Sequence, residues 1–189
     1  MFEVFKEYLL QHIELNEHDF ALLETYAHPK KLRKRQYLLQ EGDVCRYNCF
    51  ITHGLMRMYA VDQKGEEHVI RFASENWWIS DRESIISGLP SRFNIDAIED
   101  TEVLLFDKAS IDLLMHQIPS FGKLITDMLN KSFVTFQNRV HESISYNAEE
   151  KYTKFVERYP AFALRVPQAM IASYLGIKPE TLSRLRSKR

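Results

Sequence analysis

Near the start of the chain, hydrophobic residues recur at the three- and four-residue spacing of amphipathic helices. A first helix is predicted by Phe2, Phe5, Leu9 and Ile13. Asn16 has the side chain of a helix N-cap, so a second helix is predicted to begin there. Pro29 is predicted to stop that helix.

Between Lys31 and Asp107 the hydrophobic period shortens toward two. Short apolar runs alternate with turn residues such as Gly42, Gly54 and Gly65. The runs cover residues 37–39, 49–52, 55–61, 68–73, 95–98 and 103–106. Many short strands at this spacing predict an antiparallel jelly roll or a small barrel.

A long helical stripe follows, formed by Ile125, Leu129, Phe133, Phe136, Val140 and Ile144. Such a stripe has two possible partners, the barrel or the same helix of a second subunit. We favour both, with a homodimer contact in the later half at Phe133, Phe136, Val140 and Ile144. A helix that packs only on its own domain is the alternative.

The last residues of the chain predict a helix-turn-helix. Pro167 suits a first helical position, Gly176 suits the turn, and Leu182 and Leu185 lie on one face of the second helix. The opposite face of that helix is polar, as a helix that reads bases in a major groove requires. Candidate DNA contacts are Lys178, Glu180, Thr181, Ser183, Arg184, Arg186 and Lys188.

Charge is distributed unevenly along the chain. From Arg165 onward there are six basic residues and one acidic residue, Glu180, whereas the preceding part holds 19 basic and 25 acidic residues. The net charge of −1 therefore conceals a basic end that can neutralise phosphates. A solvated basic tail is the simpler alternative, but it would not need leucines at helical spacing.

Composition limits the size of the core, the expected cellular location and the chemistry of the cysteines. With 189 residues, 45% of them hydrophobic, the chain can bury a sizeable core. Neither a signal peptide nor a membrane span is expected, because charged residues interrupt the first 15 positions, and we expect a cytoplasmic protein. Cys45 and Cys49 cannot form a four-cysteine cluster and are expected to be free thiols, with Cys49 buried.

The order of these parts resembles the Crp/Fnr (cAMP-receptor and fumarate-nitrate-regulator) family of bacterial transcription factors. The matching elements are Glu41-Gly42-Asp43, His53-Gly54-Leu55-Met56-Arg57, the turn at Gly65, residues 88–92, residues 99–103 and residues 171–184. The resemblance covers nearly the whole chain and is most specific in the last element. It implies that Glu180 and Arg184 read bases, with Ser183 beside them. Pro179 stands where some members carry arginine, so the family's preferred operator is not carried over.

The sensor half departs from members that bind cyclic nucleotides. Those members carry a Phe-Gly-Glu element and a Pro-Arg-Ser/Thr-Ala element, whereas residues 77–83 here contain no Gly-Glu pair and Arg92 is displaced by one position. A shift of one residue on a strand turns the side chain to the other face. The resemblance places a pocket for an unidentified small effector at Trp78, Ser80, Asp81, Arg82, Ser91 and Arg92. A regulator controlled by cAMP or cGMP is the alternative.

Two side-chain groups in this half allow a simpler interpretation. Trp77 and Trp78 suit core packing better than ligand stacking. Arg57, Arg71 and Arg82 could hold an acidic effector, although isolated arginines are more often surface residues.

Enzyme signatures are not apparent. His53 and His68 form no His-x-His pair for a cupin metal site, and Ser145 replaces the second histidine that His141-Glu142 would need in a zinc protease. No Walker loop, dinucleotide fingerprint or Gly-x-Ser-x-Gly element occurs. We expect neither catalysis nor a metal, and no cofactor is certain. A sensor module without DNA binding is the remaining alternative, against which the helix-turn-helix argues.

These observations predict an α+β chain with three parts. Residues 1–118 form N-terminal helices and a β-roll sensor resembling cyclic-nucleotide-binding domains, residues 119–147 a dimerisation helix, and residues 148–189 a DNA-binding helix-turn-helix domain. The expected function is sequence-specific transcription regulation. Expected partners are double-stranded DNA and a second copy of the chain; RNA polymerase is a further candidate, and no membrane partner is expected.

Overall fold

The computed structural model describes residues 1–187. The chain begins with two short helices, α1 (Phe2–Leu10) and α2 (Glu17–Tyr26). The Asn16 side chain accepts a hydrogen bond from the Asp19 amide at 2.8 Å, which satisfies a free donor at the start of α2. Both predicted helices are therefore present, and α2 ends three residues before Pro29.

Two four-stranded antiparallel sheets follow. Their strand orders are β1-β8-β3-β6 and β2-β7-β4-β5, which confirms the predicted antiparallel roll. The strands are β1 (His28–Leu32), β2 (Tyr37–Leu39), β3 (Tyr47–His53), β4 (Leu55–Val61), β5 (Glu67–Ser74), β6 (Trp78–Ile79), β7 (Asn94–Ala97) and β8 (Thr101–Asp107). Cys45 and Cys49 are free and buried in this region, and burial raises the pKa of both thiols.

The strand β1 was not predicted. Four of its five residues are exposed and polar or proline, so it shows no hydrophobic period. Among the described strands it pairs with β8 alone and forms the edge of its sheet, a position where lysine and proline are tolerated. Within residues 1–118, two helices were also missed, α3 (Arg82–Ser87) after β6 and α4 (Lys108–Gln117) after β8.

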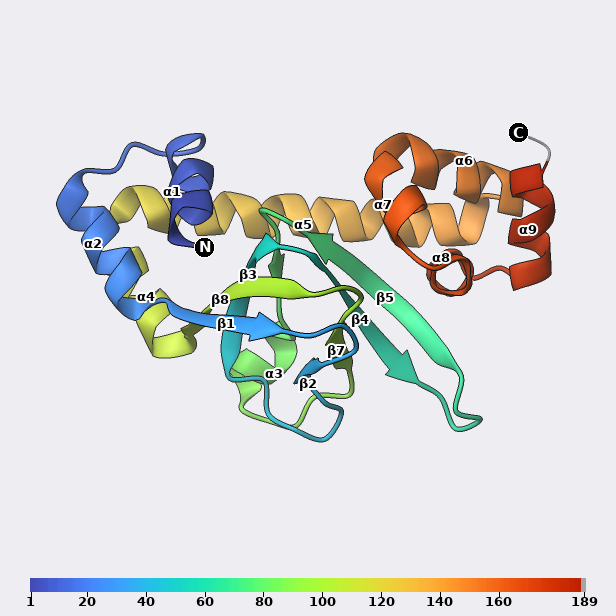
Figure 1. The fold of residues 1–189 in the computed structure, drawn as a ribbon, viewed down its shortest axis with the longest axis horizontal. Helices are drawn as coiled ribbons and strands as arrows, with labels where there is room; N and C mark the ends of the chain where they lie inside the picture. The colour runs from blue at the N-terminus through green and yellow to red at the C-terminus, as the bar shows by residue number, and fades with distance from the viewer. Residues whose placement is uncertain (188–189) are drawn as a thin grey trace.

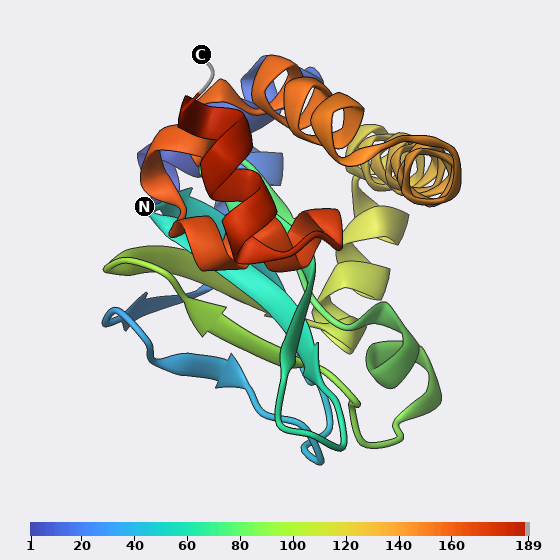
Figure 2. The ribbon, with the colours of Figure 1, turned by 90° about the vertical axis from the view of Figure 1, so that its right-hand side faces the viewer.

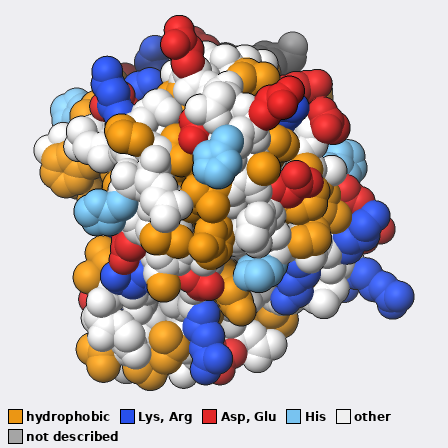
Figure 3. Space-filling model, turned by 90° about the vertical axis from the view of Figure 1, so that its left-hand side faces the viewer, with side chains coloured by type: hydrophobic (Ala, Val, Ile, Leu, Met, Phe, Trp, Pro, Cys, Tyr) orange, Lys and Arg blue, Asp and Glu red, His pale blue; other side chains and the backbone are white. Residues whose placement is uncertain are grey.

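The long helix α5 (Pro119–Ser145) runs along the whole molecule (Figure 1). The N-terminal helices lie at one of its ends and the C-terminal helices at the other, with the two sheets below it. Figure 3 shows the N-terminal end, where acidic, basic and hydrophobic side chains are interspersed.

Four short helices follow α5. They are α6 (Ala148–Arg158), α7 (Pro160–Arg165), α8 (Gln168–Leu175) and α9 (Pro179–Ser187). Asn147 begins α6 with a capping box, in which its side chain accepts from the Glu150 amide while the Glu150 carboxylate accepts from the Asn147 amide. We call α6 to α9 the C-terminal helical unit.

Three hydrophobic clusters hold these layers together. One lies between the sheets and includes Ile51, Met56 and Ile95. A second packs α1, α2, α4 and the first half of α5 against the outer face of β3 and β8. The third joins the outer face of β4 and β5 to the C-terminal helical unit, so that Phe72 and Leu182 belong to one cluster. Figure 2 shows the helices of this unit lying against the strands.

Candidate DNA-binding interface and sensor region

The turn between α8 and α9 has the geometry of a helix-turn-helix. Gly176 ends α8 in the left-handed conformation, with φ of +64°, and the Ile177 amide donates to the Ala172 carbonyl at 3.0 Å. Leu182 on α9 is fully buried among the hydrophobic residues of α6 and α8. The apolar face therefore anchors α9 and fixes which residues face outward.

The outward face of α9 carries the predicted DNA contacts. Lys178, Glu180, Ser183 and Arg184 are exposed, and Thr181 and Arg186 are half-buried. Within the part of the chain that the structure describes, no ion pair involves the charged members of this set. Lys188 lies outside the described residues. Apart from a bond of 3.4 Å from Arg184 to the Glu180 carbonyl on the same helix, the charged members of the six others are available to an external partner.

Arg165 does not belong to that surface, although the sequence places it in the basic C-terminal segment. Its guanidinium donates to both carboxylate oxygens of Glu75, at 2.8 and 2.9 Å, and to Glu99. Glu75 also accepts from the Gly54 amide, and although partial burial opposes ionisation, these donors hold its pKa at about 2. Arg165 therefore joins α7 to the sensor sheets.

Two further side chains join α8 to β5, the edge strand of its sheet. The Ser173 hydroxyl donates to the Glu67 carbonyl at 2.6 Å and accepts from the Val69 amide at 3.0 Å. Arg139 on α5 donates to the carbonyls of Val69, Ile70 and Tyr174. Sequence reasoning missed both residues, because bonds from a side chain to a distant backbone leave no periodic signal.

The later half of α5 exposes the predicted dimer residues. Phe133 is 62% exposed, Phe136 59%, Val140 42% and Ile144 81%, whereas Phe121 and Ile125 in the first half are buried. Four large apolar side chains at steps of three and four form one stripe on this helix. A stripe that the chain's own domains leave uncovered has the properties of a subunit contact.

Of the six predicted effector residues, only Trp78 and Ser80 line a common cavity, which is described below. Trp78 packs against Phe5, Phe50 and Phe106, with ring centroids 5.3 to 6.1 Å apart, in the cluster between the N-terminal helices and the sheet. It thus serves mainly as a core residue, as the simpler interpretation expected. Ser80 is half-buried at the end of β6.

The other four effector candidates divide into two pairs. Asp81 caps α3 and accepts a hydrogen bond from the Ser91 hydroxyl at 2.7 Å, so the two buried side chains satisfy each other. Arg82 and Arg92 are exposed, and Arg92 lies 3.3 Å from Glu83. The turn that holds a phosphate in cyclic-nucleotide-binding relatives is here closed by its own hydrogen bonds.

The arginines with a suggested effector role also differ in their surroundings. Arg57 is buried and makes two hydrogen bonds to Asp96, at 2.8 and 3.0 Å, and one to Glu67. Although burial opposes its charge, these carboxylates raise the pKa of Arg57. Arg57 is therefore already paired, whereas Arg71 lines a cavity described below.

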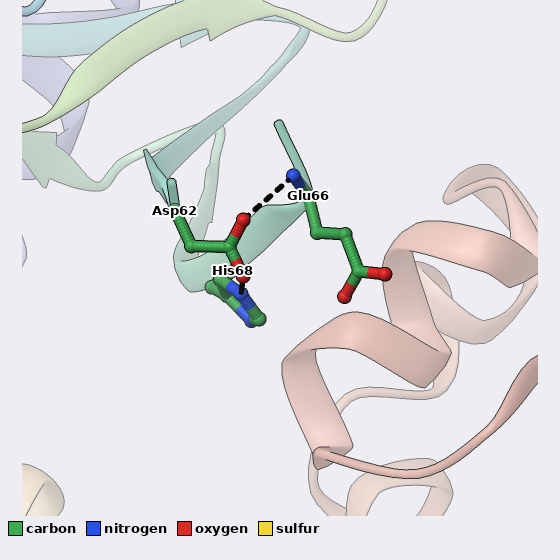
Figure 4. A group of neighbouring side chains, drawn as sticks. All are labelled: Asp62, Glu66 and His68. Atoms are coloured by element: carbon green, nitrogen blue, oxygen red, sulfur yellow. Dashed lines mark hydrogen bonds and ion pairs between the residues drawn. The ribbon is translucent and has the colours of Figure 1, made fainter. Parts of the chain in front are cut away.

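Asp62, Glu66 and His68 lie close together at the hairpin between β4 and β5 (Figure 4). Asp62 accepts from the amides of Lys64 and Glu66, at 2.8 and 3.0 Å, and its other oxygen lies 3.1 Å from His68 Nε2. The bond to His68, with those amides, lowers the pKa of Asp62. These bonds shape the hairpin turn between β4 and β5.

Comparison with known proteins adds evidence of relationship. Residues 29–117 match the model of the cyclic nucleotide-binding domain. The chain is 26% identical over 183 residues to the regulatory protein HlyX of Actinobacillus pleuropneumoniae, covering 90% of this chain and 75% of HlyX. It is 25% identical to the fumarate and nitrate reduction regulatory protein of Yersinia pestis, covering 90% and 72% of the two chains.

Solved structures share the fold. FixK2 from Bradyrhizobium japonicum superposes with a TM-score of 0.75 at 21% identity, covering 86% of this chain and 83% of FixK2. A CooA variant from Carboxydothermus hydrogenoformans gives 0.75 at 16% identity, covering 95% and 83%. Among the described residues, no helix is long and apolar enough to cross a membrane.

Proposed function

The chain belongs to the Crp/Fnr family and is a DNA-binding transcription regulator, and from that premise we propose that it binds DNA as a homodimer through its α9 helices. The observation that carries this proposal is the outward face of α9, where no ion pair among the described residues involves the exposed charges, while Leu182 anchors the opposite face. Glu180, Ser183 and Arg184 would read base edges, and Lys178 and Arg186 would contact phosphates. Thr181 is a further base-reading candidate.

The dimer would form through the exposed stripe on the second half of α5. Phe133, Phe136, Val140 and Ile144 would each lose water-exposed surface against the same helix of a second copy. A two-fold dimer presents two recognition helices to half-sites one DNA turn apart. Residues 1–118 would then serve as the sensor, 119–147 as the dimerisation helix and 148–189 as the DNA-binding domain.

We further propose that the effector is a small molecule other than cAMP or cGMP. The support is the closed turn at Asp81 and Ser91 together with the outward position of Arg92. Since its target is chromosomal DNA, we place the protein in the bacterial cytoplasm. We also propose RNA polymerase as a partner of the DNA-bound dimer, which transcription with purified components on the selected operator would test.

Selection of bound fragments from a random DNA pool is the direct test. The purified full-length protein should enrich one inverted repeat, with half-site centres about 34 Å apart. Enrichment of unrelated sequences, or of one unpaired half-site, would contradict the proposal that a dimer binds two half-sites.

A further inference from the structure

A cavity of about 670 Å³ lies where β5, the middle of α5 and the C-terminal helical unit meet. Four cationic side chains line it: Arg71, Lys131, Arg139 and Arg158. None of the described side chains that line it is a carboxylate. Arg158 is paired with Glu142, which does not line the cavity, so the net attraction for an anion comes from Arg71, Lys131 and Arg139.

Arg71 differs from the other buried cations of the sensor. No described residue forms a hydrogen bond or an ion pair with its guanidinium, whereas Arg57 has two carboxylate partners. The loss of water around Arg71 lowers its pKa, and the neighbouring Tyr159 and Tyr174 only partly offset that effect. A half-buried guanidinium without a partner is costly to keep, and an anion bound beside it would remove that cost.

Aromatic rings form one wall of the same cavity. Trp77, Tyr159 and Phe162 pack on one another, with centroids 5.3 to 5.9 Å apart. Tyr174 closes this wall on the side of Arg139, whose guanidinium lies 4.0 Å from the ring centroid. Such a wall suits the flat apolar surface of an aromatic ligand.

We propose that this cavity binds a small aromatic anion, with Arg71 holding the anionic group and the aromatic wall holding the ring. The proposal deepens the proposed function, on which it rests for the idea that this half is a sensor. The cavity shares Trp78 and Ser80 with the effector pocket that the resemblance implies, but it differs from the turn at residues 88–92 because its cation, Arg71, comes from β5.

Occupancy of this cavity would act on the junction between sensor and C-terminal helical unit. Arg71 directly follows Ile70, whose carbonyl accepts from Arg139, and Arg139 also bonds the Tyr174 carbonyl of α8. An anion that attracts Arg71 would shift β5, the strand to which Arg139 is hydrogen-bonded. Ligand binding should therefore change operator affinity.

Fluorescence titration with anilinonaphthalene sulfonate, an aromatic anion, tests the site, and phenylnaphthylamine serves as its neutral analogue. Wild-type protein should bind one sulfonate probe per chain. Arg71→Gln should weaken that binding about tenfold, the size of one lost charge-assisted contact, and leave the neutral probe unaffected. Arg82→Gln, which removes an exposed charge outside the cavity, is the matched control and should bind both probes as wild type does.

Thr135→Trp provides a second variant, because Thr135 lines the cavity from the exposed side of α5 and a larger residue there would fill it. This change should weaken the binding of both probes. Unaltered sulfonate binding in both cavity variants would overturn the proposal, as would an equal loss in Arg82→Gln. Operator binding by the wild-type protein without probe tests the proposed function separately. If the protein did not bind an operator, the probe titrations would still show whether the cavity binds an aromatic anion.

Discussion

The guanidinium of Arg139 on α5 lies over the ring of Tyr174 on α8, 4.0 Å from its centroid, and donates to the Tyr174 carbonyl at 3.1 Å. The same guanidinium donates to the Val69 and Ile70 carbonyls of β5. One side chain thus connects the long helix, the sensor sheet and the first helix of the helix-turn-helix. Burial lowers the pKa of Arg139.

Replacing Arg139 with methionine should destabilise the fold and loosen α8. The change keeps an unbranched side chain but leaves three carbonyl acceptors without their donor, which costs about 2 kcal/mol in the free energy of unfolding. Urea unfolding should show this loss, and hydrogen exchange should increase in α8 and β5. Lys123→Met, an exposed change on the same helix, should alter neither quantity. Equal stabilities of the two variants would rule out the connecting role of Arg139.

The ion pair between Glu75 and Arg165 should make stability depend on pH in the acid range. The carboxyl pKa falls from its ordinary 4.5 to about 2 in the folded protein, so its contribution is complete above pH 4.5 and disappears as pH falls toward 2. Because the pair is partly exposed, we expect about 1 kcal/mol after solvent screening. The free energy of unfolding of the wild-type protein should fall by this amount between pH 5 and pH 2.5, whereas Glu75→Gln should lack this contribution at both pH values. If the free energy of unfolding changed equally with pH in the two proteins, the assignment would be contradicted.

Hydrophobic patterning explains why much of the fold could be predicted. The strands around Ile51 and Met58 are continuous apolar runs that are buried on both faces, and the stripe from Ile125 to Ile144 repeats at helical spacing. The edge strand β1 escaped prediction because an edge does not require alternation. The short helix α3 escaped because its start depends on Asp81, whose side chain caps it through the Glu83 amide at 3.1 Å.

The candidate sites were predictable to different degrees. The α9 surface follows from spacing alone, because buried Leu182 dictates which neighbours face outward. The role of Arg165 could not be read in this way, since its partners Glu75 and Glu99 are 90 and 66 residues away. Arg71 likewise resembled a surface arginine until the packing of α5 and the C-terminal helical unit enclosed it.

Introducing a charge into the exposed stripe of α5 should prevent dimerisation. Val140→Glu would place a carboxylate without a partner in an apolar seam, where its desolvation costs several kcal/mol. Sedimentation at micromolar concentration should show wild-type dimers and mutant monomers. Asn138→Asp adds the same charge at an exposed position on the opposite face of the helix and should remain dimeric. A wild-type monomer, or a dimer in both variants, would exclude this interface.

Within α9, Arg184 should contribute to sequence preference and Lys178 to overall affinity. Arg184→Ala should cost about 1 to 3 kcal/mol on the selected operator and relax the preference at one base position. Lys178→Ala should weaken all sequences similarly and reduce the slope of affinity against salt concentration. Competition binding on operator and scrambled DNA separates the two effects. If Arg184→Ala bound the operator as tightly as wild type, Arg184 would not read bases.

Isothermal calorimetry should detect no binding of cAMP or cGMP at micromolar nucleotide concentrations. Each nucleotide must desolvate a ribose hydroxyl and a phosphate, and each group left without a protein partner costs about 1 to 3 kcal/mol. Here Asp81 is already bonded to Ser91, and Arg92 is exposed beside Glu83. Neither the ribose hydroxyl nor the phosphate therefore meets the partner that cyclic-nucleotide-binding members of the family provide. Together these losses weaken binding by about two to four powers of ten. A saturable one-to-one isotherm at micromolar nucleotide, accompanied by tighter operator binding, would establish a cyclic nucleotide as the effector.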